Sequence, residues 1–262
     1  MWAAKYSEAM GMNITRAPQF ERWLLDKIKA WLESQPRAEG LHVSDILYPM
    51  KAYWKKVDPR PMTDTEAGYF VAGLGHHYII ESIIEGSKKV GKADSGTNTW
   101  EGIYYSPDIL TPHPLEIKTS RSKIGPATET PRGLQSAYEN YLAQLTAYMA
   151  IRNDPKGDLL VFYLNLADPE SKGRSIPQFR WYPVVLTKKE LADRRVALRI
   201  TKGALLLALK KKDPKNLELC PQWQCRGCQW LTKCQPWKLD PSRARLDPKA
   251  PKEKRSPRGL KR

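Results

Sequence analysis

Apolar residues recur at helical spacing in several segments of the chain. The first segment, residues 18 to 34, places on this spacing Phe20, Trp23, Leu24, Ile28, Trp31 and Leu32. A second begins after Thr63 and Glu66, which form a capping-box pattern, and ends at Gly86. Each of these two segments is therefore predicted to be a helix.

Three further helices follow from the same reasoning. A short one begins at Ser44, and a long one covers roughly residues 134–152. Thr187 and Glu190 form another capping-box pattern, and they open a helix of about 25 residues that ends in lysines 210–212.

Strand patterns lie between these helices. Residues 98–119 are aromatic and β-branched with interrupting prolines, which predicts strands and a turn. Residues 158–167 are apolar enough for a strand buried on both faces, and residues 179–186 predict another strand. Helices, strands, a helix and further strands together indicate an α/β core with a helical N-terminal cover.

Composition and charge divide the chain further. Residues 238–262 are rich in Pro, Lys and Arg, so we expect a disordered tail. This tail contains ten Lys or Arg and three acidic residues, a net +7 of the total +16, which leaves +9 for the body. A basic body indicates a polyanionic partner, and nucleic acid is the simplest one. Including the tail, the expected regions are 1–60 (helical), 61–212 (core), 213–237 (cysteine module) and 238–262.

Two observations bear on location. No segment approaches the roughly 18 apolar residues that a membrane helix requires, so no membrane partner is expected. The four cysteines all lie within residues 220–234, and such a cluster indicates a metal and a reducing compartment. We therefore expect a cytoplasmic protein.

Four short patterns that carry candidate chemistry occur in order. They are Gly73-x-x-x-His77, Asp108, Glu116-Ile117-Lys118 and Gln144-x-x-x-Tyr148. Each is weak alone, since a helical histidine, an aspartate after a proline and a charged strand face are all common without any catalytic role.

Together the patterns describe a site for a hard cation. On a strand, Glu116 and Lys118 face the same side and Ile117 points into the core. Asp108 would lie beside Glu116 on the neighbouring strand, and two acidic oxygens with a main-chain carbonyl suit Mg²⁺ or Mn²⁺. Gln144 and Tyr148, four residues apart, share a helix face that looks onto this site.

The order of these motifs resembles the RecB-like branch of the PD-(D/E)XK nucleases, which includes CRISPR-associated and phage recombination exonucleases. The resemblance spans roughly residues 44–234. It implies a restriction-endonuclease-like core, in which a central mixed sheet is flanked by helices. It also implies metal-dependent hydrolysis of DNA phosphodiester bonds, by an exonuclease in recombination, repair, phage or CRISPR-related processing.

The resemblance also assigns roles. It implies metal ligation by His77, Asp108, Glu116 and the Ile117 carbonyl. Lys118 would orient or activate water, and Gln144 with Tyr148 would hold the site. The residues implied to contact DNA are Lys118, Arg121 and Tyr148.

The cysteine spacing is C-x4-C-x2-C-x5-C, formed by Cys220, Cys225, Cys228 and Cys234. Such spacing suits Zn²⁺ or an iron–sulfur cluster. The last three resemble the C-terminal cysteines of the iron–sulfur subset of RecB-like nucleases, which implies a four-iron four-sulfur cluster. That subset has its fourth cysteine far upstream, where this chain has Tyr48, so Cys220 would replace it and make the site local. Trp223 and Trp230 nearby either pack or stack on unpaired bases.

Three functions remain open at this stage. The first is the Mg²⁺- or Mn²⁺-dependent deoxyribonuclease, and the second is a catalytically silent DNA-binding or assembly subunit. The third is a redox or metal sensor centred on the cysteines. The chain has no phosphate-binding loop motif, so helicase activity would come from a partner, and a helicase, a recombinase or a CRISPR adaptation protein would fit.

Overall fold

The computed structural model describes residues 17–35, 38–86, 98–110, 112–121, 130–167, 175–225 and 228–238. Its helices are α2 (Pro18–Ser34), α3 (Val43–Leu47), α4 (Pro49–Val57), α5 (Asp64–Gly86), α6 (Pro131–Ala137), α7 (Glu139–Arg152), α8 (Lys188–Lys211), α9 (Gln222–Cys225) and α10 (Leu231–Lys238). Its strands are β1 (Leu41–His42), β2 (Thr99–Trp100), β3 (Ile103–Tyr104), β4 (Leu115–Ser120), β5 (Lys156–Ala167) and β6 (Ser175–Val185). Apart from Lys238, the last residue of α10, the expected disordered tail lies outside the described residues.

The strands form two small mixed sheets. The larger has the order β4-β5-β6, in which β4 runs parallel to β5 and β5 runs antiparallel to β6. The smaller has the order β1-β3-β2. The protein is therefore mixed α/β, as the sequence predicts.

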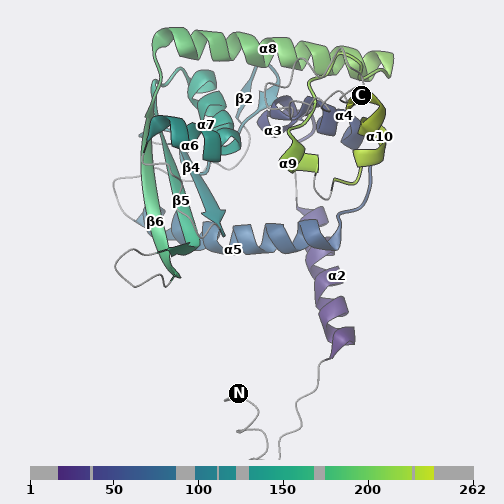
Figure 1. The fold of residues 1–262 in the computed structure, drawn as a ribbon, viewed down its shortest axis with the longest axis vertical. Coiled ribbons are helices and arrows are strands. Elements are labelled where there is room, and N and C mark those ends of the chain that lie inside the picture. Colours follow the sequence, from purple (N-terminus) through teal and green to yellow (C-terminus); the bar gives the residue numbers. More distant parts are fainter. Residues whose placement is uncertain are drawn as a thin grey trace, which may run out of the picture.

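Helices cover both faces of the larger sheet. On one face Ile117 and Leu160 pack with Ile80 of α5. On the other face, Leu159, Val161 and Tyr163 pack with Leu145 and Met149 of α7. Strand β5 is thus buried on both sides over much of its length, as its apolar sequence predicts, and β4 is held between the same two helices (Figure 1).

Both predicted capping boxes are present. Thr63 accepts a hydrogen bond from the backbone N–H of Glu66 (3.1 Å) at the start of α5, and Thr187 accepts one from Glu190 (3.2 Å) at the start of α8. The structure places the ends of α5 at Gly86 and of α8 at Lys211, close to the predicted ends.

Two predicted helices are each divided in two. The helix expected from Ser44 is interrupted at Tyr48, because the following Pro49 disfavours helical backbone at the residue before it. The long helix expected around residues 134–152 is interrupted at Tyr138. The backbone of this residue is not helical (φ −123°, ψ 31°), and its side chain is buried against Tyr163.

The first helix differs from the expected cover. Helix α2 is present but buries none of its residues. It is held to α5 by ion pairs from Arg22 (2.8 Å) and Lys29 (3.1 Å) to Asp64, and it projects from the rest of the molecule (Figure 1). Within the described part of the chain, no helix is long and apolar enough to cross a membrane.

Candidate active site

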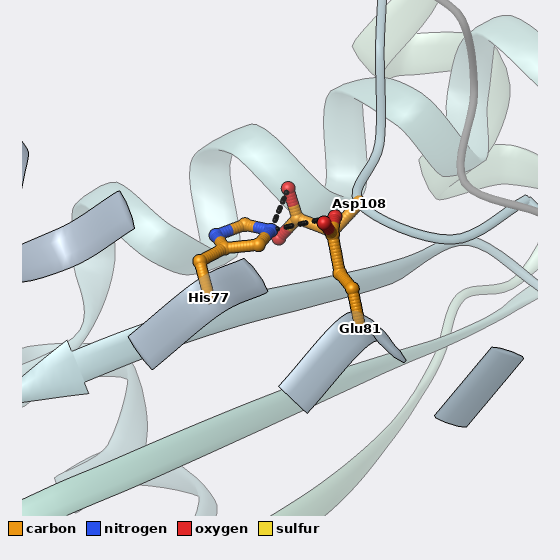
Figure 2. A group of neighbouring side chains, drawn as sticks. All are labelled: His77, Glu81 and Asp108. Carbon is orange, nitrogen blue, oxygen red and sulfur yellow. Dashed lines mark hydrogen bonds and ion pairs between the residues drawn. The ribbon is translucent and has the colours of Figure 1, made fainter. Parts of the chain in front are cut away.

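Three polar side chains meet between α5 and the segment before β4. Nε2 of His77 lies 2.9 Å from Oε1 of Glu81 and 3.1 Å from Oδ1 of Asp108 (Figure 2). Among the described residues, these three form the group whose potential metal-ligand atoms all lie within 4.8 Å of one another. His77 and Asp108 were predicted from the sequence, whereas Glu81 was not.

The Asp108 carboxylate is fixed by the strand beside it. Asp108 lies in a bend and not in the strand predicted from the sequence, because it is the next residue, Ile109, that pairs with Leu115 of β4. Its Oδ2 accepts a hydrogen bond from the backbone N–H of Ile117, while Oδ1 faces His77. This pairing brings Asp108 to β4 without a full neighbouring strand.

The middle of β4 carries the predicted acid and base. Ile117 packs in the core, and Lys118 Nζ donates a hydrogen bond to Oε1 of Glu116, so these two side chains share a face as predicted. Glu116 is fully buried, and its second oxygen, Oε2, has no hydrogen-bond partner. A buried carboxyl oxygen without a partner is unfavourable, and a bound cation or an ordered water would satisfy it.

The surroundings of Glu116 and Lys118 change the pKa values of both side chains. Burial first, and the negative charge of Asp108 second, raise the pKa of Glu116 to about 8. Burial alone would lower the pKa of Lys118, but the charges of Glu116 and Asp108 outweigh it and raise that pKa. Glu116 therefore resists ionisation in the metal-free site, even beside the ammonium of Lys118.

The histidine is strongly affected by its neighbours. Burial would lower the pKa of His77, but hydrogen bonds to Asp108 and Glu81 raise it to about 10. Without a metal, His77 is therefore protonated at neutral pH. A cation bound at its Nε2 would have to displace this proton.

Helix α7 contributes aromatic residues to the site. Gln144 Nε2 donates a hydrogen bond to the hydroxyl of Tyr148 (2.9 Å), so this pair shares a helix face as predicted. Burial and then the charge of Glu116 raise the pKa of Tyr148, which shows that its hydroxyl lies near the acids. The ring centroid of Tyr141, a residue outside the four sequence motifs, lies 5.8 Å from Lys118 Nζ. Spacing of three and seven residues from Gln144 and Tyr148 was the signal that could have identified it.

The donor set suits a hard divalent cation. Carboxylate oxygens and an imidazole nitrogen converge, and Glu116 supplies a buried oxygen that has no partner. Magnesium and manganese take such oxygen-rich sites. Glu116 lies outside the group of three in Figure 2. Asp108 contacts His77 directly, and its connection to the strand that carries Glu116 is the hydrogen bond from the Ile117 N–H. The predicted DNA contact Arg121 is exposed just beyond β4.

The cysteines gather around one small cavity. Its lining residues are Met50, Lys51, Leu219, Cys220, Cys225, Cys228, Trp230, Leu231 and Cys234. None of the four cysteines forms a disulfide, and burial raises the pKa of Cys220 to about 12. No three of their sulfur atoms fall within the 4.8 Å separation that the His77 group meets, within the described part of the chain.

The cysteine segment contacts the N-terminal part of the chain, next to α4. Trp230 is 3% exposed and its Nε1 donates to the carbonyl of Asp58 (2.9 Å), so it packs in the protein. Lys233 pairs with the Asp58 carboxylate (2.8 Å). The Tyr48 hydroxyl hydrogen-bonds with Gln224 and lies near Cys220, so this tyrosine borders the cysteine segment. The side chain of Trp223 is outside the described residues.

The sequence matches no protein-family model and no curated protein. Among solved structures, the crystal structure of SSO0001 is similar at a TM-score of 0.51 and 17% identity, covering 82% of this chain and 96% of that chain. An alkaline exonuclease (LHK-Exo) from Laribacter hongkongensis aligns at a TM-score of 0.40 and 16% identity, covering 71% of this chain and 95% of its own. At these identities the first likeness concerns the fold alone: this chain shares the fold of SSO0001.

Proposed function

We propose that this protein is a metal-dependent DNA nuclease that uses Mg²⁺ or Mn²⁺. The observation that carries the proposal is the buried Glu116, whose Oε2 has no partner, beside Asp108 and Lys118. The order of the sequence motifs, which resembles RecB-like nucleases, supports the same function. DNA as substrate is supported by the charge of +16.

The metal would be held by oxygen atoms of Asp108 and Glu116 and by His77 after loss of its proton, with Glu81 and the Ile117 carbonyl as further candidates. A divalent cation bound there would polarise a phosphate, lower the pKa of a water and neutralise charge on the leaving oxygen. Each of these effects acts on hydrolysis of a phosphodiester bond.

The protein side chains supply position and charge. The Ile117 N–H keeps one oxygen of Asp108 in place, which leaves the other oxygen facing His77. Lys118 holds an ammonium beside Glu116, where it can orient a water or contact a phosphate. Tyr148 is only 4% exposed and bonded to Gln144, which favours a positioning role for this pair over direct contact with DNA.

The narrower assignments belong to the same proposal. We propose exonuclease activity in recombination, repair or CRISPR-related processing, with a helicase, a recombinase or a CRISPR adaptation protein as partner. We propose that Cys220, Cys225, Cys228 and Cys234 bind a structural four-iron four-sulfur cluster or Zn²⁺. The cavity that these four cysteines line together supports a metal there.

The test is cleavage of end-labelled linear DNA and of circular DNA, single- and double-stranded, with Mg²⁺ or Mn²⁺. Wild type should degrade DNA, and Asp108→Ala, Glu116→Ala and Lys118→Ala should each lose activity while remaining folded. Asp26→Ala is the matched control, because this exposed acid lies on α2, pairs with Arg22 and should leave cleavage unchanged. Binding of DNA without cleavage by wild type under any condition would instead favour the silent DNA-binding subunit.

A further inference from the structure

Helix α8 carries an apolar stripe on its outer face. Val196, Ile200 and Leu207 are 50%, 66% and 48% exposed. With Gly203 they follow spacings of four, three and four residues, which is the repeat by which one helix packs along another. Figure 1 shows α8 running along one edge of the molecule, with the sheets and the other helices on one side of it.

The helix itself is firmly anchored, so the stripe is not a sign of a loosely placed element. Its inner face buries Leu191, Leu198, Leu205 and Ala208. Arg194 and Arg195 donate hydrogen bonds to backbone carbonyls of α7, at 2.8 and 2.6 Å. The 24 residues of α8 thus form a rigid rod about 36 Å long, with one side available for packing.

The stripe is complementary to itself when a second copy runs antiparallel. Pairing Ile200 with the partner's Gly203 places a large side chain against the residue that lacks one. The same register pairs Val196 with the partner's Leu207. A Cβ added at Gly203 would meet no atom of the described residues within 4 Å, so the glycine leaves room for a second helix to approach closely.

The same antiparallel register also pairs opposite charges and pairs large side chains with small ones. It places Asp193 opposite the partner's Lys210, which joins opposite charges at both ends of the stripe. It also places Leu206, which is 47% exposed, opposite the partner's Ala197. Asp193 already pairs with Lys189 at 2.9 Å, but both side chains are exposed and such pairs contribute little, so Lys210 can share it.

We propose that α8 is a self-association surface, through which two copies of this chain form a symmetric dimer with antiparallel α8 helices. The surface is the same on both copies, as a twofold interface requires. Because each copy would contribute a single helix to the contact, we expect weak association, with a dissociation constant on the order of 10 µM.

The effect of salt distinguishes a second copy of the chain from nucleic acid as the partner of α8. Apart from the Asp193–Lys210 contacts, two copies that each carry +16 repel each other, so added salt should leave the dimer unchanged or strengthen it. Nucleic acid bound along the lysines of α8 would instead be released by salt.

The experiment is sedimentation velocity of the full chain, freed of nucleic acid, from about 1 to 100 µM at low and high salt. Wild type should shift from monomer to dimer across this range. Ile200→Glu should remain monomeric, whereas Val185→Glu should still dimerise, because Val185 is an equally exposed apolar residue (71%) on β6.

Two further sets of variants test the register. Asp193→Lys and Lys210→Asp should each weaken the dimer about tenfold, and the double variant should restore it. Gly203→Ala should raise the thermal stability of the monomer and weaken the dimer. A monomer at every concentration, a dimer that survives Ile200→Glu, a charge swap without rescue, or a dimer that dissociates with salt would each overturn the proposal.

Discussion

The buried carboxylate of Glu116 should make the metal-free protein less stable than a neutral variant. The pKa of Glu116 is about 8 in the folded protein, compared with an ordinary value of 4.5. At pH 7 only the interval from 4.5 to 7 contributes, because the folded group is still mostly protonated there, and at about 1.4 kcal/mol per pKa unit this costs about 3 kcal/mol of unfolding free energy. The amide oxygen of Glu116→Gln can still accept from Lys118, so we expect a gain of about 1 to 3 kcal/mol after imperfect hydrogen bonding is allowed for.

The pH dependence follows from the direction of the change. Because the folded state holds this proton more tightly than the unfolded chain does, the stabilising contribution is complete below about pH 4.5. It is lost as the pH rises through about 8. The advantage of Glu116→Gln should therefore be small at pH 5 and large at pH 8.

Urea unfolding in the presence of a chelator, at several pH values, measures this difference. At roughly 2 to 4 °C per kcal/mol, the melting temperature at pH 7 should rise by about 5 °C. Glu39→Gln, on an exposed glutamate, is the control and should change neither quantity. The reasoning is refuted if Glu116→Gln destabilises the protein at pH 7, or if its effect is the same at pH 5 and pH 8.

Substitutions at three other positions give separate tests. Tyr141→Leu should lower kcat about tenfold with little change in KM, because it removes the ring near Lys118. Tyr141→Phe keeps the ring and should retain activity. An equal loss of kcat in the two variants would contradict a role for the ring. Cys228→Ala should reduce the amount of bound metal, and it should lower the unfolding free energy by at least about 2 kcal/mol. A metal content equal to that of wild type would argue against the cysteine site. Thr187→Ala should lower the unfolding free energy by about 1 kcal/mol, because the N-cap of α8 is lost; urea unfolding that shows no change would exclude this role.

Local features of the sequence predicted much of this fold. The capping boxes at Thr63 and Thr187 mark helix starts because a side chain bonds to a backbone N–H only three residues away. The alternation around Ile117 fixed which side chains of β4 share a face. Such contacts lie within one element, so one element's sequence is enough to predict them.

The parts that were missed depend on contacts between distant segments. The break at Tyr138 comes with burial against Tyr163 of β5, which no local pattern shows. Glu81 lies four residues after His77, but only the approach of Asp108 distinguishes it from an ordinary surface glutamate. The sequence likewise placed Asp108 near β4, yet its position in a bend follows from the pairing of the next residue.

The central claim is that the groups around Glu116 and Asp108 hydrolyse DNA with a divalent metal. The most direct test is the rate of DNA cleavage as Mn²⁺ is returned to chelator-treated protein, comparing wild type with Asp108→Asn purified identically. The account predicts cleavage by wild type that rises with Mn²⁺, and none by a folded Asp108→Asn. Equal cleavage by both proteins, or cleavage by wild type that does not depend on the metal, would contradict it.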